Sequence, residues 1–340
     1  MSNESIAPIR LETTRTETYV SVGQKIPVSL HPGGPLDHKV FVKLSLPLGV
    51  PASGAVQVLS GPMMWNHRYW DFEGPEGSGD RYNWTAHAAV RGHATVAIDR
   101  IGIGRSSHPA SELVDASSNA HVNYQVVMAA REGRLLGPDG PVTFRKTVVV
   151  SHSFSTAVTE KLLTAHPDVC DLAVMSGFTH KPRLDNFATR VLANLEDGEE
   201  RPQGYRTTIP LTRHIMFYWP APIDGPVLAY DEAVCKSTLT TAEWDSLAAF
   251  LEEKVDVRVP LLFALGQHDA MFAASGAPKG PYGSETSSVA ALLAEEQPNL
   301  GDDIPELTGF ILPGGGHNLN QMPNAVSWFD FAQDWITERL

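Results

Sequence analysis

The sequence contains only two cysteines, Cys170 and Cys235, among its 340 residues. A chain of this length buries enough apolar surface to fold without disulfides or a structural metal. Two scattered cysteines could pair, but they are more typical of a reducing compartment than of a disulfide-stabilised secreted scaffold. The sequence also lacks any run of about 18 apolar residues, so we expect no transmembrane helix.

The sequence has fewer basic than acidic residues, with 26 Lys and Arg against 39 Asp and Glu, and its formal net charge is −13. Nucleic acids and anionic membranes bind through basic surfaces, so we expect neither as a partner. Residues 1–5 carry an acid and no apolar core, so no signal peptide is expected. We therefore expect a cytoplasmic enzyme whose oligomeric state is open, a homo-oligomer included.

The pattern of apolar residues predicts an α/β fold. Residues 19–27 and 40–46 alternate apolar and polar positions and predict two antiparallel strands, the second half-buried at a sheet edge. Near-continuous apolar strands that alternate with helices are typical of a mostly parallel sheet covered on both faces. The elements predicted in this part are strands at residues 55–59, 94–98, 147–150 and 172–175, and helices at residues 84–91, 120–136 and 154–165.

This alternation is interrupted over residues 181–255. The segment carries prolines, a charged stretch at residues 196–201 and the aromatic residues Phe217, Tyr218 and Trp219, with helical stretches and no obvious strand. We interpret it as a helical cap inserted into the sheet domain. The sheet domain then consists of residues 1–180 and 256–340, and its second part is predicted to contain strands at residues 260–265 and 309–312 and a helix at residues 325–339.

The first motif with chemical meaning surrounds Ser153. A buried strand runs straight into Ser151-His152-Ser153-Phe154-Ser155 and then into a helix, which is the pattern of a nucleophile elbow. The turn is so tight that the residues two before and two after the nucleophile must be small. Glycine is usual at both places, and serine, the residue found here, is nearly as small. The alternative is an ordinary strand-to-helix turn rich in capping serines.

The second motif follows the strand at residues 94–98 and reads Asp-x-x-Gly-x-Gly-x-Ser over residues 99–106. Its glycines allow a turn without a Cβ clash. The spacing could be mistaken for a dinucleotide fingerprint, but that fingerprint needs a third glycine opening a helix in a βαβ unit. Pro109 and the polar residues after it argue against such a helix, so we expect no NAD binding.

A carboxylate and a histidine follow the last two predicted strands. Asp269 ends a Gly-x-x-Asp sequence after one strand, and His317 follows a glycine run after the other. In parallel sheets, functional residues gather at the carboxyl ends of the strands, on the side where the Ser153 elbow also lies. A loop-capping aspartate and a surface histidine are the alternatives, but position and order favour a catalytic triad of Ser153, Asp269 and His317.

Taken together, these motifs resemble those of the α/β-hydrolase superfamily, in the capped subgroup that includes esterases, lactonases and proline iminopeptidases. The resemblance covers residues 40–340, and the order Ser, Asp, His is that of this superfamily rather than of chymotrypsin or subtilisin. It implies the α/β-hydrolase fold, with a mostly parallel sheet, flanking helices and an inserted cap. The motifs are specific for the fold and the triad, but not for the substrate.

The resemblance also suggests where an oxyanion hole lies. The loop after the third strand usually reads His-Gly-x-Pro in this superfamily, whereas this chain has Leu59-Ser60-Gly61-Pro62. If Pro62 matches the family proline, the backbone N–H groups of Gly61 and Phe154 bind the oxyanion. If the register differs by one residue, Pro62 has no N–H to donate, and Met63 takes the role of Gly61.

We expect a carboxylic ester or lactone as the substrate, since epoxide and haloalkane hydrolases of this fold use an aspartate nucleophile. The residues expected to bind it are Met63, Phe217, Tyr218 and Trp219, which favour a hydrophobic molecule such as a zearalenone-like macrolactone; they could instead only join the cap to the core. Amide hydrolysis, acyl transfer, cofactor-free lyase or peroxidase-like chemistry and small-molecule binding without turnover are the alternatives. We expect no metal or organic cofactor, with His67 and His87 at the surface.

Overall fold

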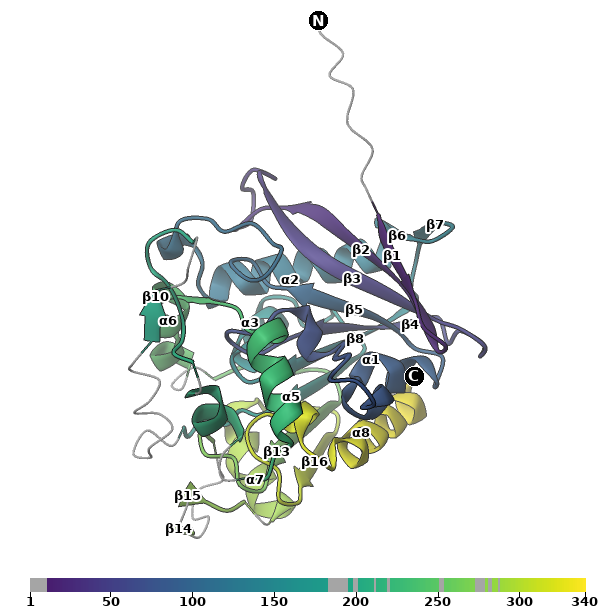
Figure 1. Ribbon diagram of the computed structural model, residues 1–340. Coiled ribbons are helices and arrows are strands. Elements are labelled where there is room, and N and C mark those ends of the chain that lie inside the picture. Colours follow the sequence, from purple (N-terminus) through teal and green to yellow (C-terminus); the bar gives the residue numbers. More distant parts are fainter. Residues whose placement is uncertain are drawn as a thin grey trace, which may run out of the picture.

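The computed structural model describes residues 11–182, 195–197, 201–210, 212–218, 221–250, 254–272, 279–280, 283–286 and 288–340. Its centre is a nine-stranded sheet in the order β1-β2-β3-β5-β4-β8-β9-β13-β16 (Figure 1). β1, β2, β3 and β5 pair antiparallel, whereas all pairs from β5 to β16 are parallel. The strands are β1 (Glu12–Arg15), β2 (Tyr19–Val28), β3 (His38–Pro47), β4 (Ala55–Ser60), β5 (Ala94–Asp99), β8 (Lys146–His152), β9 (Leu172–Ser176), β13 (Leu261–Gly266) and β16 (Leu307–Leu312).

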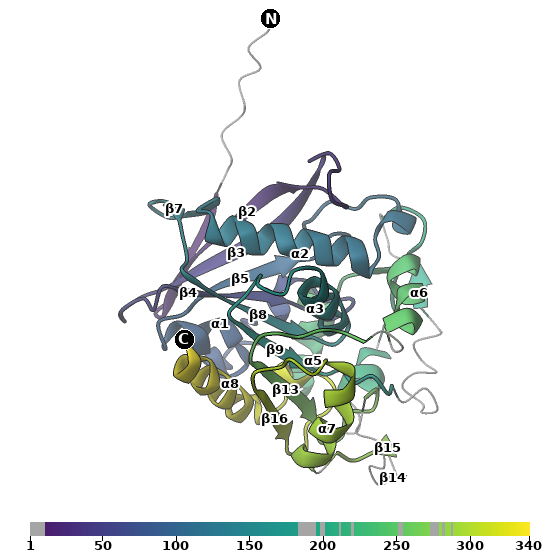
Figure 2. The ribbon, with the colours of Figure 1, turned by 180° about the vertical axis from the view of Figure 1, so that it is seen from behind.

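Helices cover both faces of this sheet, as its continuous apolar strands require. Every residue of β4, β5, β9 and β13 is buried, which is typical of parallel strands inside an α/β domain. One face carries α1 and α8 (Figure 1), and the opposite face carries α2 and α3 (Figure 2), while α7 packs against β16. These helices are α1 (Trp84–Ala89), α2 (Ala116–Arg131), α3 (Phe154–Ala165), α7 (Val289–Glu296) and α8 (Ala325–Arg339). The predicted mostly parallel sheet with flanking helices is confirmed.

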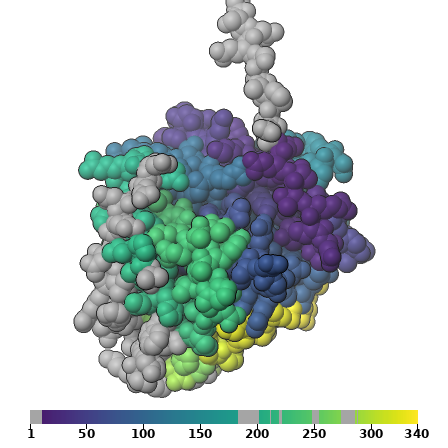
Figure 3. All heavy atoms as spheres, viewed as in Figure 1, coloured from purple at the N-terminus to yellow at the C-terminus, as the bar shows by residue number. Residues whose placement is uncertain are grey.

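The chain leaves the sheet after β9 and returns to it at β13. The described residues between them include helices and two π-helical turns, and also a small antiparallel sheet in the order β10-β11-β12. The expectation of no strand in this segment is therefore wrong. The elements are β10 (Leu195–Asp197), β11 (Tyr205–Thr208), the π-helical turns His214–Tyr218 and Asp231–Cys235, α5 (Gly225–Tyr230), β12 (Leu239–Thr240) and α6 (Thr241–Phe250). In Figure 3 these residues, in green, border the dark-blue residues around α1 and the yellow residues of α8.

Several further elements differ from the expectations. β3 lies between β2 and β5 instead of at an edge. α2 begins four residues earlier than predicted, because Asp115 caps it. It ends at Arg131, shortly before Gly133, whose φ is +70°. The short hairpins β6 (Leu135–Gly137) with β7 (Gly140–Val142) and β14 (Lys279–Gly280) with β15 (Gly283–Ser284), like α7, were not predicted.

Both cysteines, Cys170 and Cys235, are buried and free. The core of the molecule lies on the two faces of the large sheet and is built from its strands and the helices packed on them. In the part of the chain that is described, no helix combines the length and the apolar character that crossing a membrane requires.

Candidate active site

Ser153 lies at a sharp turn between β8 and α3. Its backbone has φ +57° and ψ −129°, a conformation that L-residues rarely adopt. Met64, in the loop after β4, has φ +62° and is the one other non-glycine residue with positive φ in the described chain. Strained backbone of this kind persists where the surrounding structure enforces it, often at functional sites. The two strained residues lie on the elbow and on the predicted oxyanion loop.

The predicted triad residues lie within hydrogen-bonding distance of one another. His317 Nε2 is 2.9 Å from Ser153 Oγ, and His317 Nδ1 is 2.8 Å from Asp269 Oδ2. Asp269 and His317 are each 1% exposed and Ser153 is 6% exposed. The distances are those that a nucleophile, a general base and an orienting carboxylate require.

The loops that hold Asp269 and His317 approach each other closely, and glycines permit this. A Cβ added to Gly266, the last residue of β13, would lie 2.1 Å from the carbonyl oxygen of Gly316. The His268 N–H donates to the Gly315 carbonyl at 2.8 Å, which joins the two loops. Gly266 therefore permits the close packing of the two loops. In the glycine run before His317, a Cβ added to Gly316 would lie 2.6 Å from the carbonyl oxygen of Tyr218.

The carboxylate of Asp269 has a fixed orientation. Its Oδ1 accepts backbone N–H bonds from Met271 at 2.8 Å and Phe272 at 2.9 Å, which leaves Oδ2 for His317. A carboxylate held in this way orients the imidazole and fixes its tautomer, with the proton on Nδ1 and the lone pair on Nε2.

A second histidine, His152, lies beside the triad. Its ring centroid is 5.1 Å from that of His317, and it stacks on Tyr69 at 5.1 Å. Burial is the main cause that lowers the pKa of His152 well below its usual value, and the neighbouring His317 imidazole adds to it, so the His152 ring is neutral at pH 7. Its Nδ1 is 2.9 Å from Ser176 Oγ. Gly177 is required here, since a Cβ there would lie 2.2 Å from the His152 ring.

The Asp-x-x-Gly-x-Gly-x-Ser loop is held together by its aspartate. Asp99 Oδ1 accepts bonds from the backbone N–H of His67 at 2.6 Å and binds His67 Nδ1 at 2.8 Å. Asp99 Oδ2 accepts the Arg105 N–H at 2.8 Å, and Gly104 is required because a Cβ there would meet that oxygen at 2.4 Å. The expectation that His67 lies at the surface is wrong, because it is only 6% exposed and bound to Asp99.

The candidate oxyanion donors lie on two segments, the start of α3 and the loop after β4, which a side-chain hydrogen bond connects. Phe154 is the first residue of α3, where the backbone N–H groups have no partner within the helix. Ser155 Oγ donates to the Gly61 carbonyl at 2.5 Å and so joins the elbow to the loop after β4. Met63 lies in the same loop and is 6% exposed. The serine that replaces the usual glycine of the elbow thus has a specific partner.

Aromatic rings surround His317. The Phe217 ring centroid is 5.9 Å from that of His317, and the Phe272 centroid is 5.7 Å from it. Tyr218 is fully buried, and its hydroxyl accepts a bond from Asn318 Nδ2 at 2.7 Å. The segment after β9 thus reaches His317 through Phe217, and the neighbouring Asn318 through Tyr218. Phe272, which sequence reasoning missed, has no signal other than its place three residues after Asp269.

Trp219, the fourth residue expected to bind substrate, lies outside the described residues. A cavity of about 500 Å³ opens between α2 and α3, with His121, Lys161 and His166 among its lining residues, and it contains no residue of the triad.

The described residues contain no group of three or more His, Cys, Asp or Glu side chains that could hold a metal ion. The expectation that the chain needs no metal or organic cofactor stays a prediction.

Similar proteins were found by structure. No protein-family model matches the sequence, and no curated protein matches it. An α/β-hydrolase fold protein from Chitinophaga pinensis is 11% identical, with a TM-score of 0.56 over 92% of this chain and 96% of that one. A Paleococcus ferrophilus monoacylglycerol lipase is 15% identical, with a TM-score of 0.56 over 88% and 99%. An Arabidopsis methylesterase is 12% identical, with a TM-score of 0.52 over 83% and 99%. The chain therefore has the α/β-hydrolase fold.

Proposed function

We propose that this protein is a serine hydrolase that cleaves a carboxylic ester or lactone through an acyl-enzyme on Ser153. One observation carries the proposal: Ser153, on a strained elbow, is hydrogen-bonded to His317, which is in turn hydrogen-bonded to a buried Asp269. A fold hosts many activities, so this side-chain geometry, and not the fold, is the basis for the reaction type.

The geometry supports a two-step reaction. His317 Nε2 takes the proton of Ser153 Oγ as the oxygen attacks the substrate carbonyl, and the tetrahedral oxyanion is held by backbone N–H groups. His317 then gives its proton to the leaving alkoxide, which departs as an alcohol. Water next attacks the acyl-enzyme, losing a proton to His317, and the acid is released as Ser153 regains its proton. In a lactone the alcohol and the acid belong to one molecule.

The surroundings of His317 support a hydrophobic substrate. Phe217 and Phe272 place two apolar rings beside the base, and a substrate with a large apolar acyl or alcohol group would bury its surface against them. A zearalenone-like macrolactone is one molecule of this type. We further propose residues 181–255 as a cap that governs substrate choice, inserted between core segments 1–180 and 256–340.

A panel of substrates tests the proposed reaction. The panel contains p-nitrophenyl esters of increasing acyl length, lactones of increasing ring size and matched anilides. Hydrolysis of the esters with an initial burst of p-nitrophenol supports an acyl-enzyme, and opening of the lactones extends the reaction to cyclic esters. Cleavage of anilides at rates equal to those of the esters favours an amidase. Binding of these compounds to the folded protein without turnover favours a receptor, and turnover that appears only with an added alcohol acceptor favours acyl transfer.

Replacing Phe217 by leucine tests the contribution of this segment to specificity. We expect kcat/KM for a long-chain or macrocyclic substrate to fall about 10- to 200-fold, the range that small changes in a hydrophobic pocket produce. A p-nitrophenyl acetate, too short to reach the ring, should change little. Steady-state kinetics with both substrates on the same protein measures the difference.

Phe329→Leu is the matched control for that variant. Phe329 is fully buried in α8 against Trp84, with ring centroids 5.6 Å apart, so the same substitution removes packing far from the triad. This variant should have a lower Tm, and its kcat/KM should change by the same factor for the two substrates. An equal loss on both substrates in Phe217→Leu, together with a lower Tm, would mean that Phe217 only packs the segment onto the core.

A further inference from the structure

Arg100 is a fully buried arginine under the candidate active site, in the loop that follows β5. Its Nη1 donates to three acceptors: the Gly61 carbonyl at 2.8 Å, the Pro62 carbonyl at 3.2 Å and Ser155 Oγ at 3.0 Å. Its guanidinium carbon also lies 5.0 Å from the centroid of the Phe154 ring. One side chain therefore contacts both the oxyanion loop and the nucleophile elbow.

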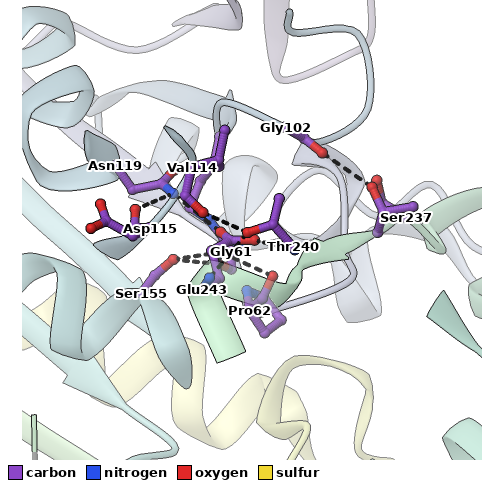
Figure 4. Close-up of polar contacts among 12 residues, drawn as sticks. Gly61, Pro62, Gly102, Val114, Asp115, Asn119, Ser155, Ser237, Thr240 and Glu243 are labelled. Carbon is purple, nitrogen blue, oxygen red and sulfur yellow. Dashed lines mark hydrogen bonds and ion pairs between the residues drawn. The ribbon is translucent and has the colours of Figure 1, made fainter. Parts of the chain in front are cut away.

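The other end of this network lies in the segment between β9 and β13. Arg100 Nη2 is 3.2 Å from Oε1 of Glu243, a fully buried residue of α6. Glu243 also accepts bonds from Asn119 Nδ2 at 3.1 Å and from the Thr240 N–H at 2.9 Å. Figure 4 shows Glu243 and Thr240 next to Gly61 and Pro62 of the loop and Ser155 of the elbow.

Stability alone is a poor reason for this ion pair. Burial raises the pKa of the Glu243 carboxyl and lowers that of the Arg100 guanidinium, because both charged forms lose their hydration. Replacing a buried ion pair with uncharged residues of similar shape is often neutral or stabilising. The contacts of Arg100 with backbone carbonyls point to a different role.

Those contacts fix the direction of one candidate oxyanion donor. In a planar trans peptide, the carbonyl and the following N–H point in opposite directions. The Pro62 carbonyl points at Arg100, so the Met63 N–H points away from it. The peptide between Gly61 and Pro62, whose carbonyl is also held by Arg100, has no N–H to offer. Met63 is therefore the first residue after Gly61 that has a backbone N–H, and Arg100 sets the orientation of that N–H.

We propose that Arg100 is a positioning residue: by binding the Gly61 and Pro62 carbonyls and Ser155, it holds the Met63 N–H and the Phe154 N–H as the paired donors of the oxyanion hole. Glu243 holds the guanidinium in place, so the segment between β9 and β13 takes part in ordering the hole. The proposal deepens the proposed serine-hydrolase function and rests on it.

The test separates positioning from stability. In Arg100→Met/Glu243→Gln the charges are removed together, and glutamine keeps an acceptor for Asn119 and Thr240. Arg100→Lys keeps the charge but loses the forked donors. We expect kcat to fall about 10²- to 10³-fold in both variants, the usual effect of losing an oxyanion donor, while KM changes little. The affinity for a trifluoromethyl ketone, which forms a tetrahedral adduct on serine, should fall with kcat.

Lys43→Met/Asp71→Asn is the matched control. Lys43, in β3, and Asp71 form another ion pair with little exposure to solvent. Its removal should shift Tm and leave kcat and ketone affinity unchanged. The proposal would be overturned if the folded Arg100→Met/Glu243→Gln variant kept the kcat and the ketone affinity of the wild type. It would also be overturned if the loss of kcat in both Arg100 variants were no larger than the fraction of protein that is unfolded.

The rate of fluorophosphonate labelling keeps this test apart from that of the function. Labelling reports on Ser153 directly and needs no natural substrate. A folded wild-type protein that is not labelled would refute the proposed function. If the wild type and Arg100→Lys are labelled at the same rate, the positioning role of Arg100 is refuted but the proposed function is not. Labelling of the variant that is slower by about 10-fold or more supports the positioning role.

Discussion

Ser153→Ala should lower kcat by about 10⁶-fold, to the level at which only binding and the oxyanion hole remain. The substitution removes the nucleophilic oxygen and keeps the Cβ, so the backbone strain at φ +57° is unchanged. The hydroxyl's bond is to His317, at 2.9 Å, so the free energy of unfolding should change little. Kinetics with a chromogenic ester, and thermal unfolding of the same preparation, measure both quantities.

Ser151→Ala is the matched control within the elbow. Ser151 is buried, and its hydroxyl is 3.4 Å from the Val174 carbonyl, a long contact that does not involve His317. We expect this variant to keep most of the activity. If Ser151→Ala were inactive and Ser153→Ala active, the elbow would have been assigned to the wrong serine.

Asp269→Asn should lower kcat by about 10⁴-fold, as the equivalent change does in a serine protease. The structure gives the reason. Because Oδ1 accepts the Met271 and Phe272 N–H groups, an asparagine would turn its NH2 toward His317 Nδ1. Nδ1 must then accept, the ring proton moves to Nε2, and Nε2 can no longer take the proton of Ser153.

Steady-state kinetics and Tm together test this variant. The side-chain shape and the two backbone bonds are retained, so Tm should fall by a few degrees at most. Near-wild-type kcat in Asp269→Asn would leave the triad without its acid. A large drop in Tm with activity lost in proportion would show that Asp269 serves folding rather than catalysis.

The sequence predicted the elements whose limits have local causes. The bounds of α3 and α8 coincide with their predictions, since the elbow sets the start of α3 and Pro323 precedes α8. The three residues of the candidate triad could be placed because each follows a predicted strand, and parallel strands bring their carboxyl ends to one edge. Their meeting within 2.8 and 2.9 Å follows from that topology.

The remaining features depend on contacts that no local pattern contains. The strands β10 to β12 are two to four residues long, too short for an alternating pattern to show. β3 became an inner strand because β5 pairs with it, and strand order is not a local property. The Arg100–Glu243 pair joins residues 143 positions apart. Arg100 occupies a variable position of the Asp-x-x-Gly-x-Gly-x-Ser motif, and Glu243 lies in none of the motifs, so nothing local pairs the two.

Covalent labelling with a fluorophosphonate, mapped by mass spectrometry, tests the central claim most directly. The reagent forms a stable bond with a serine whose hydroxyl is activated by a histidine, and it releases fluoride. We predict that Ser153 is the one residue modified in the wild type. In Asp269→Asn the reaction should be too slow for any modification to be detected within the time of the experiment. A folded, unlabelled wild-type protein, or a label on Ser151 or Ser155 instead, would contradict the account.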